Sequence, residues 1–318
     1  MTSPRPPVAL ERLLESGEAR VDRVEPLPGD VSARRYYRLH LEGGGTAVAA
    51  VYPTDLAGAC RRFLRTGALL ASVGVRVPGI ELAACERSVM IVEDLGDRTL
   101  FDLGGAGWEA LAPWYAKASA VLVAIRGLPR RDVEALGNEP LGTDLLLREL
   151  DRTWAVLIEP RRLLPRELSD RLREVLTATC GRMGDGDLVP CHRDLMARNL
   201  VPLEAGELAI LDHQDLRLGP SAYDLASLLN DSLFPPPELE EALLAEALPA
   251  LGLGHEAYHD AALHRTLKAA GTFAAAATAR HERLLPATLG RALRHLRRVA
   301  GGADLAEEVE RLWRGEIC

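Results

Sequence analysis

The chain of 318 residues is 47% hydrophobic and 26% charged, which is typical of a globular protein long enough for two lobes. A formal net charge of −8 and a pI of about 5.6 argue against nucleic acid or an anionic membrane as a partner. No apolar run reaches the ~18 residues of a membrane span, and the first residues lack the apolar core of a signal peptide. The five cysteines form no CxxC pair, so neither a disulfide framework nor a zinc site is expected. We therefore expect a cytoplasmic protein.

The N-terminal part is predicted to be rich in β-structure. After a short helix over Val8 to Glu18, the strings SARRYYRLHL and TAVAAVY flank a glycine turn, and this pattern predicts a β-hairpin. The turn before the hairpin, Gly29 to Ser32, either folds over phosphate groups with its backbone N–H groups and the Ser32 hydroxyl or is an ordinary strand entry. Ser88 to Val92 is nearly all apolar and predicts a buried strand.

The chain beyond residue 96 is predicted to be helical, because apolar residues recur there at three- and four-residue spacing. One expected helix, Leu56–Ser72, precedes residue 96. The others are Trp108–Ile125, Asp144–Ile158, Pro165–Cys180, Ala222–Leu233, Glu238–Leu248, Glu256–Arg283, Pro286–Val299 and Asp304–Arg314. We expect the helix from Glu238 to end before Pro249, which disfavours a helical residue ahead of it. The expected fold class is α/β, with a small β-rich part over residues 1–95 and a larger helical part over residues 96–318.

The stretch VPCHRDLMARNLVPLEAGELAILDHQD, residues 189–215, has the spacing of a phosphotransfer site. Two short apolar strands around a turn predict a hairpin. If Leu203 lies opposite Leu208, the antiparallel register brings Asn199 opposite Asp212, with Cβ atoms roughly 5 Å apart. Oxygen ligands of this kind suit Mg²⁺, which takes one or two carboxylates together with waters and substrate phosphates.

Asp194 lies on the loop that enters this hairpin, where a carboxylate that does not bind the metal can orient and deprotonate an attacking hydroxyl. Chance is the alternative, because His-Arg-Asp strings arise readily in an Arg-rich chain, and Asp and Asn favour loops. The full spacing favours the phosphotransfer interpretation, since Asn199 follows Asp194 by five residues and Asp212 follows a complete hairpin.

Several strings carry a family resemblance. CHRDLMARN followed by ILDHQD resembles the catalytic loop and metal-binding aspartate of the aminoglycoside phosphotransferase-like kinases, and LGPSAYDLASLLND resembles the helix that follows their metal site. Three more strings, GDVSARRYYRL, MIVEDLGDRTL and LKAAGTF, resemble the branch of bacterial sugar kinases that phosphorylate the anomeric hydroxyl of N-acetylmuramate and N-acetylglucosamine. The resemblance covers most of the chain in order.

The resemblance implies a two-lobed protein-kinase-like fold that binds ATP and Mg²⁺ and phosphorylates a small-molecule hydroxyl. Ser32 would lie in the loop over the nucleotide, and main-chain groups from Glu93 to Leu95 would meet the adenine edge. Asp194 would be the base, and Asn199 and Asp212 the metal ligands.

Four further residues of this region have less decided roles. Asp224 would steady the catalytic loop, although Ser221 with Asp224 also fits a helix-capping pattern. His192 is expected to be a hydrogen-bonded structural residue. Arg198 and Asp215 would each face the acceptor or the developing phosphate charge, or pair with a surface partner.

The chain departs from the kinase pattern in its second strand. Protein kinases carry there a lysine that holds the α- and β-phosphates and pairs with a helix glutamate. This chain has Ala49-Ala50-Val51 instead, and the following helix contains no glutamate. Either ATP binding is impaired or another cation substitutes, with Arg34 and Arg38 on one face of an alternating strand and Arg35 on the other.

Two alternatives to the amino-sugar kinase therefore stay open. One is a kinase of another small molecule, such as an aminoglycoside, whose polycationic substrate requires a strongly acidic pocket. The other is a catalytically inactive nucleotide-binding scaffold, which the missing lysine and glutamate suggest. The intact Asp194, Asn199 and Asp212 argue against the scaffold.

Overall fold

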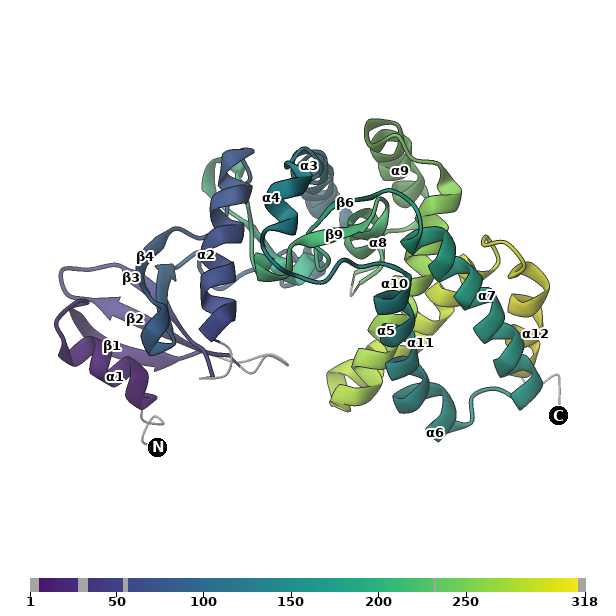
Figure 1. Ribbon diagram of the computed structural model, residues 1–318, viewed down its shortest axis with the longest axis horizontal. Coiled ribbons are helices and arrows are strands. Elements are labelled where there is room, and N and C mark those ends of the chain that lie inside the picture. The colour runs from purple at the N-terminus through teal and green to yellow at the C-terminus, as the bar shows by residue number, and fades with distance from the viewer. Residues whose placement is uncertain (1–5, 28–33, 54–56, 232, 314–318) are drawn as a thin grey trace.

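A five-stranded antiparallel sheet and a mostly helical body form two lobes, which the computed structural model describes over residues 6–27, 34–53, 57–231 and 233–313 (Figure 1). The sheet has the order β1-β2-β3-β5-β4. Its strands are β1 (Val21–Pro26), β2 (Arg35–Leu41), β3 (Thr46–Val51), β4 (Ile80–Ala84) and β5 (Val89–Glu93). The predicted hairpin is β2–β3, whereas the exposed edge strand β1 was not predicted.

Each face of this sheet is covered by one helix, because side chains alternate between the two faces along every strand. Helix α1 (Val8–Glu15) packs on the face formed by residues such as Leu39, Ala47 and Ile91. Helix α2 (Ala57–Ser72) packs beside the opposite face, against Ala50 and Met90. The second face also forms one wall of the cavity between the lobes.

The large lobe consists mainly of helices with two short strand pairs. The helices are α3 (Trp108–Arg126), α4 (Arg130–Glu134), α5 (Thr143–Thr153), α6 (Glu159–Arg161), α7 (Arg166–Gly184), α8 (Tyr223–Leu229), α9 (Pro237–Leu251), α10 (His255–Ala276), α11 (Ala279–Leu296) and α12 (Ala303–Trp313). A π-helical turn at Trp154–Ile158 follows α5. The strand pairs are β6 (Leu188–Cys191) with β9 (Arg217–Pro220) and β7 (Leu200–Pro202) with β8 (Leu208–Ile210).

Several helix boundaries differ from the expectation; Pro286, for example, lies inside α11 and does not begin it, and α8 ends at Leu229 instead of Leu233. Two of the differences have a clear physical reason. Helix α9 continues through Pro249 to Leu251, because Leu248 and Leu251 are buried and their packing keeps the last turn helical. The long helix expected over Glu256–Arg283 is divided in the structure, since Ala277 adopts a left-handed conformation. Thr278 then caps α11 by accepting a hydrogen bond from the N–H of His281 at 3.3 Å.

A disulfide joins Cys60 on α2 to Cys85 after β4, with the Cα atoms 5.6 Å apart. The expectation that the cysteines form no disulfide is therefore wrong. The two residues are 25 positions apart and meet because both contribute to the small apolar cluster between α2 and the sheet. Cys191 is buried.

The predicted boundary between the lobes, residues 95 and 96, falls in the loop between β5 and α3. As a division into folding units it stays a prediction. Helix α1 and helix α12 lie at opposite ends of the long axis of the molecule (Figure 1). None of the helices in the described ranges is long and apolar enough to span a bilayer.

Candidate active site

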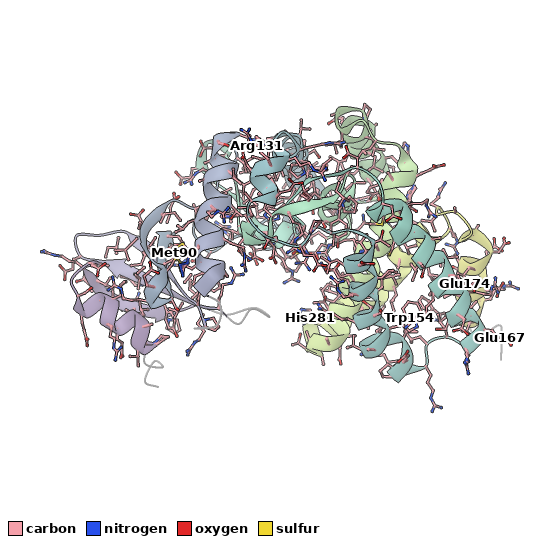
Figure 2. The ribbon with its side chains drawn as sticks, viewed as in Figure 1. Met90, Arg131, Trp154, Glu167, Glu174 and His281 are labelled. Atoms are coloured by element: carbon pink, nitrogen blue, oxygen red, sulfur yellow. A yellow bond between two sulfur atoms is a disulfide. The ribbon has the colours of Figure 1, made fainter. Side chains whose placement is uncertain are left out.

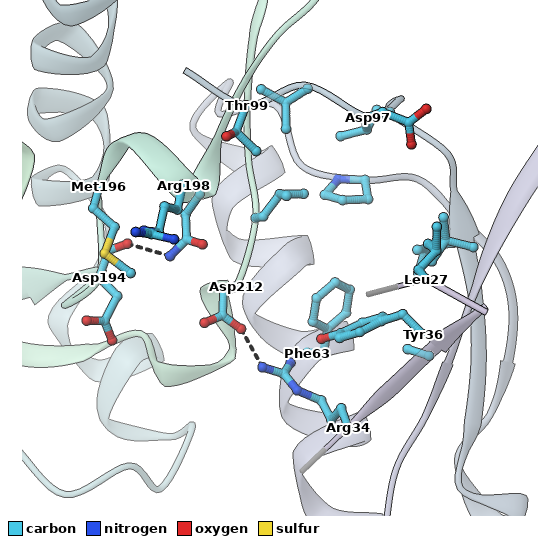
Figure 3. A pocket seen from close by; sticks show the side chains of 18 of the residues that line it. Leu27, Arg34, Tyr36, Phe63, Asp97, Thr99, Asp194, Met196, Arg198 and Asp212 are labelled. Carbon is cyan, nitrogen blue, oxygen red and sulfur yellow. Dashed lines mark hydrogen bonds and ion pairs between the residues drawn. The ribbon is translucent and has the colours of Figure 1, made fainter. Parts of the chain in front are cut away.

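A cavity of about 610 Å³ lies between the two lobes. Met90 lines it from the sheet of the small lobe and His281 from the large lobe (Figure 2). Asp194 and Asp212 direct their carboxylates into it from the large-lobe wall, and Arg34 extends towards Asp212 from the opposite wall (Figure 3). The residues that the sequence singles out for base and metal roles thus converge on one space.

Asp224, in the first turn of α8, holds the catalytic loop in place. Its carboxylate accepts hydrogen bonds from the backbone N–H groups of His192 and Arg193 at 2.6 and 2.7 Å, and from the Cys191 thiol at 3.2 Å. Burial raises the pKa of Asp224, while the hydrogen bonds from these donors oppose that rise. The capping interpretation of Ser221 and Asp224 is wrong, because no side chain caps α8.

Arg193 adopts a left-handed backbone conformation with φ of 77°, which is uncommon outside glycine. Its guanidinium pairs with Glu149 at 2.5 Å and with Asp215 at 3.2 Å. Glu149 lies on α5 and is buried, and Lys268 on α10 approaches the same carboxylate to 3.3 Å. Although burial favours the neutral acid, these cations lower the pKa of Glu149 to about 2. The unusual loop conformation is thereby stabilised by a buried ionic network.

Asp194 is held ionised by two cations from α10. Its Oδ1 lies 3.5 Å from an Arg265 nitrogen and 4.0 Å from the Lys268 ammonium. Burial alone would raise the pKa of Asp194, but Lys268 and Arg265 outweigh it and hold that pKa well below its usual range. Asp194 is therefore a carboxylate throughout the physiological pH range, able to accept a hydrogen bond from an incoming hydroxyl.

The hairpin that carries Asn199 and Asp212 exists, but its register differs by one residue from the prediction. The turn Glu204–Gly206 is a tight 3₁₀ turn, so Leu203 lies opposite Glu207 instead of Leu208. Asn199 consequently lies opposite Leu211, and the Leu211 backbone N–H donates to the Asn199 backbone carbonyl at 2.8 Å. Asp212, one residue later, has φ of 58°, and this left-handed conformation ends the strand direction.

Asn199 and Asp212 nevertheless suit a hard cation. The Asn199 side-chain N–H donates to the Asp194 carbonyl at 2.8 Å, which fixes the orientation of the amide and directs its oxygen away from that carbonyl. Both residues line the same cavity. In the described part of the chain, no group of three or more His, Cys, Asp or Glu side chains is arranged to hold a metal. Mg²⁺ would accordingly take its other ligands from water and substrate phosphates.

Arg34 immediately precedes β2 and points to the side of the cavity where Asp212 lies. Its guanidinium donates to Asp212 Oδ1 at 2.5 Å (Figure 3). It also donates to the Gln214 side-chain oxygen at 3.0 Å. Burial lowers the pKa of Arg34, but Tyr36 and Asp212 reverse this, and the group stays a cation. Arg35, in contrast, is exposed and does not line the cavity.

Arg38 also faces the cavity, but it is engaged at the connection between the lobes. It forms two hydrogen bonds with Asp94, at 2.6 and 3.1 Å, and an ion pair with Asp97 at 2.6 Å. Burial opposes ionisation of Asp94, but Arg38 outweighs it and lowers the pKa of that carboxyl. Glu93 pairs with Arg76 and donates its backbone N–H to the Gly79 carbonyl.

Of three further predicted residues, two line the cavity and one does not. Leu95 lines the cavity, as does Arg198, whose guanidinium lies 4.1 Å above the ring of Phe101. Asp215 does not line it and pairs with Arg193 and Arg217, both at 3.2 Å. The proposed surface pairing thus describes Asp215 better than an acceptor contact does.

The His192 side chain differs from the expectation. The His192 ring is fully buried, and neither ring nitrogen has a hydrogen-bond partner among the described residues, so the expected side-chain hydrogen bond is missing. Its backbone N–H is the group that bonds to Asp224. Ser32 lies outside the described residues.

Sequence reasoning missed three residues that shape the site. Glu149 lies on the buried stripe of α5, between Leu146 and Thr153, and a charge on such a stripe is the signal that would have found it. Lys268 belongs to the string LKAAGTF and is one of only two lysines in the chain. His213 gave no signal; its Nδ1 lies 2.7 Å from Thr66 Oγ1, and it thereby joins α2 to the metal-binding loop.

Comparison with known proteins places these observations in a family. The phosphotransferase enzyme family matches residues 23–263. An N-acetylmuramate/N-acetylglucosamine kinase of Pseudomonas putida is 30% identical over 280 residues, covering 81% of this chain and 78% of that protein. A protein of the same name from Pseudomonas aeruginosa is 29% identical over 234 residues, covering 71% of this chain and 66% of its own length.

Solved structures show the same fold. The choline kinase LicA from Streptococcus pneumoniae superposes with a TM-score of 0.63 at 16% identity, covering 89% of this chain and 98% of that one. At this identity the likeness concerns the fold, and it confirms the two-lobed kinase-like architecture expected from the sequence.

Proposed function

Because the chain belongs to the phosphotransferase enzyme family, we propose that it transfers the γ-phosphoryl group of ATP to a hydroxyl of a small molecule. The observation that supports this most strongly is the convergence of Asp194, Asn199 and Asp212 on one cavity wall opposite the small-lobe sheet. The reaction needs positioning and charge stabilisation more than covalent chemistry, and this wall supplies both.

Each residue has a separate task in this proposal. Asp194 accepts the proton of the acceptor hydroxyl and orients its oxygen towards phosphorus. Asn199 and Asp212 hold Mg²⁺, which would neutralise charge on the β- and γ-phosphates. Main-chain groups near Glu93 and Leu95 meet the adenine edge; the Glu93 N–H is already donated to Gly79, so an adenine acceptor atom must use a neighbouring amide. Asp224 supports the loop.

Arg34 is proposed as the cation that replaces the missing lysine. It enters the cavity from the strand paired with β3, and Tyr36, two residues on, pairs with Ala50 of the string that lacks the lysine. In the structure its guanidinium is paired with Asp212. A bound nucleotide would offer it the α- and β-phosphates, which it can bind in a bidentate manner. A catalytically inactive scaffold is disfavoured by this substitution.

An N-acetylated amino sugar, phosphorylated at its anomeric hydroxyl, is the proposed acceptor, as in the named relatives. Near Asp194 the cavity is lined by Asp231, Arg265 and Lys268, so carboxylates and cations balance. A polycationic aminoglycoside would require an acidic surplus there. An acetylated sugar has no cationic amine to place. The Phe273 and His281 rings, stacked 5.3 Å apart, also line the cavity and offer an apolar face to a sugar ring.

ATP turnover with Mg²⁺ against N-acetylated hexoses and aminoglycosides tests the proposal. We expect turnover with an N-acetylated sugar and a loss of about 10²–10⁴-fold in Asp194→Asn, the range that a general base contributes. Turnover confined to an aminoglycoside would reassign the acceptor. The absence of both turnover and Mg-ATP binding would remove the kinase proposal. Because ATP is the phosphoryl donor, the proposed site of the reaction is the cytoplasm.

A further inference from the structure

The acceptor end of the cavity contains a lysine whose task is not accounted for by the base and the metal ligands. Lys268 lies on α10, its side chain is 16% exposed, and it lines the cavity beside Asp194. All but two of the chain's 38 lysines and arginines are arginines. A compact ammonium, with three donors on a flexible stem, differs from a guanidinium in being able to follow a moving group.

The neighbours of Lys268 hold it in place without enclosing it. Its ammonium lies 3.3 Å from Glu149 Oε1 and 4.0 Å from Asp194 Oδ1, and 5.9 Å above the ring of Tyr223. Glu149 is also paired with Arg193, so its charge is shared between two cations. The Lys268 ammonium therefore lies between two carboxylates, one of which is Asp194.

Arg265, the second cation beside Asp194, is fixed more firmly. Its Nε donates to Ser227 Oγ at 3.0 Å, one of its terminal nitrogens contacts the Met196 sulfur at 3.4 Å, and its side chain is only 5% exposed. Met196, two residues after Asp194, is apolar, so the loop itself supplies no cation at this position. Of the two α10 cations, Lys268 is the more accessible to a ligand.

Two cations beside a general base lower its basicity and so make it a poorer proton acceptor. Lys268 and Arg265 must therefore have another function that outweighs this loss. A base works best with a pKa near the working pH, whereas Lys268 and Arg265 hold Asp194 as a weak base. Phosphoryl transfer depends less on proton abstraction than on stabilising the charge of the transferred group. Cations at this position therefore suit the phosphoryl group better than they suit the base.

We infer that Lys268 is a further catalytic residue, whose ammonium contacts the γ-phosphoryl oxygens during transfer. An acceptor oxygen within roughly 2.6–3.2 Å of Asp194 brings the phosphorus that it attacks next to that carboxylate. The Lys268 ammonium lies 4.0 Å from the same carboxylate, so the phosphoryl oxygens come within its reach. The bond from acceptor oxygen to phosphorus forms as the bond from phosphorus to the leaving ADP oxygen breaks. The hydroxyl proton passes to Asp194, and Lys268 keeps its protons. The inference rests on the proposed phosphotransferase function.

The test compares Lys268→Met, which removes the charge at similar length, with Lys268→Arg, which keeps it in another shape. Lys117→Met removes the chain's other lysine and is the matched control, since Lys117 contacts the Trp114 ring and the Gly206 carbonyl. For each variant we would measure kcat, the thermal midpoint, and by calorimetry without acceptor the Kd of Mg-ADP and of the Mg complex of the β,γ-imido analogue of ATP.

We expect Lys268→Met to lower kcat by about 10²–10³-fold, the usual effect of removing one such charge-stabilising donor. Its affinity for the γ-phosphate-bearing analogue should fall roughly tenfold, in line with a lost hydrogen bond to a charged group, while its affinity for ADP stays within about twofold. Lys268→Arg should fold like the wild type and recover only part of kcat. Lys117→Met should match the wild type in all four quantities.

Three results would overturn the inference. One is a kcat within about threefold of the wild type in Lys268→Met. Another is an equal loss of affinity for ADP and the analogue with a lower thermal midpoint, which indicates a structural role. The third is a loss confined to sugars that carry a carboxylate, which would assign Lys268 to the acceptor. If the wild type phosphorylates no acceptor, the proposed function fails, while the two nucleotide affinities still decide the role of Lys268.

Discussion

The two walls of the cavity are built on different principles. The large-lobe wall is over-determined, since Asp224 accepts three donors from residues 191–193, and Glu149 pairs with Arg193 and Lys268. From the small-lobe wall, Arg34 donates to Asp212 and Gln214 of the large lobe, and Arg38 pairs with Asp94 and Asp97 at the connection between the lobes. A wall fixed by a buried network suits the residues that meet reacting atoms. A wall that reaches across the cavity with single side chains suits the lobe that admits the nucleotide.

The largest effect is expected from loosening the rigid wall at Asp224. In Asp224→Ala the N–H groups of His192 and Arg193 lose their acceptor, and each buried unsatisfied donor costs about 1–3 kcal/mol. We expect a loss of about 3 kcal/mol in the free energy of unfolding and a kcat lower by about 10²–10³-fold. Urea unfolding and steady-state kinetics measure the two.

Asp224→Asn is the control for that change, because its amide oxygen still accepts one of these hydrogen bonds. It should recover part of the stability and part of kcat. If Asp224→Ala kept wild-type kcat, the loop would not depend on this anchor, and the contrast between the walls would be lost.

The difference between the walls also explains how much the sequence predicted. The spacing of Asp194, Asn199 and Asp212 is local, and it predicted that these three residues meet; the structure brings all three to one cavity. The exact register was missed, because a 3₁₀ turn and a four-residue loop have the same sequence signal. The pairs Arg34–Asp212 and Glu149–Lys268 join residues that lie far apart in the sequence, and only the packing of whole elements brings them together.

The small lobe depends on a covalent link that has no counterpart in the large lobe as described. The Cys60–Cys85 disulfide closes a loop of 25 residues, and the chain-entropy model assigns about 3 kcal/mol to a loop of that size. We expect the Cys60→Ser/Cys85→Ser variant to lose about that free energy of unfolding and to keep kcat within about twofold. Reductant breaks the same bond, so the wild type treated with reductant should resemble the variant. This reduced form matters because disulfides are rare in the cytosol.

Urea unfolding with and without dithiothreitol, together with thiol titration, measures this effect. An equal stability of oxidised wild type and double serine variant would show that the link does not stabilise the small lobe. Cys180→Ser is a matched control, since Cys180 is a buried free thiol of the large lobe.

Acid should weaken the large-lobe wall through Glu149. Its folded-state pKa of about 2 lies below the value of 4.5 that it has unperturbed. A depressed carboxyl pKa contributes stability that is fully present above the unfolded pKa and is lost as the pH falls from about 4.5 to 2. The shift corresponds to up to roughly 3 kcal/mol for this buried group.

Unfolding by urea between pH 2 and pH 6 measures that loss, with Glu149→Gln as the comparison. The variant should be less stable at pH 6, because Arg193 and Lys268 lose a buried partner, but its stability should change less with pH. Glu93 of the small lobe is one-third exposed and should contribute less to the slope. Parallel pH profiles for wild type and Glu149→Gln would contradict the assignment.

The smallest effect is expected on the small-lobe wall, at Arg34. Arg34→Ala should weaken Mg-ATP binding about tenfold, the size of one lost hydrogen bond to a charged group, and it should leave the large-lobe network intact. The same change removes the cation paired with Asp212, so binding of Mg²⁺ without nucleotide should become tighter. Weaker binding of Mg-ATP together with tighter binding of Mg²⁺ alone is expected only if Arg34 pairs with Asp212 before the nucleotide binds and with the phosphates afterwards. Arg35→Ala changes an exposed arginine next to Arg34 and should change neither affinity. If Arg34→Ala instead weakened the binding of both Mg-ATP and Mg²⁺, Arg34 would be a structural support of the metal site.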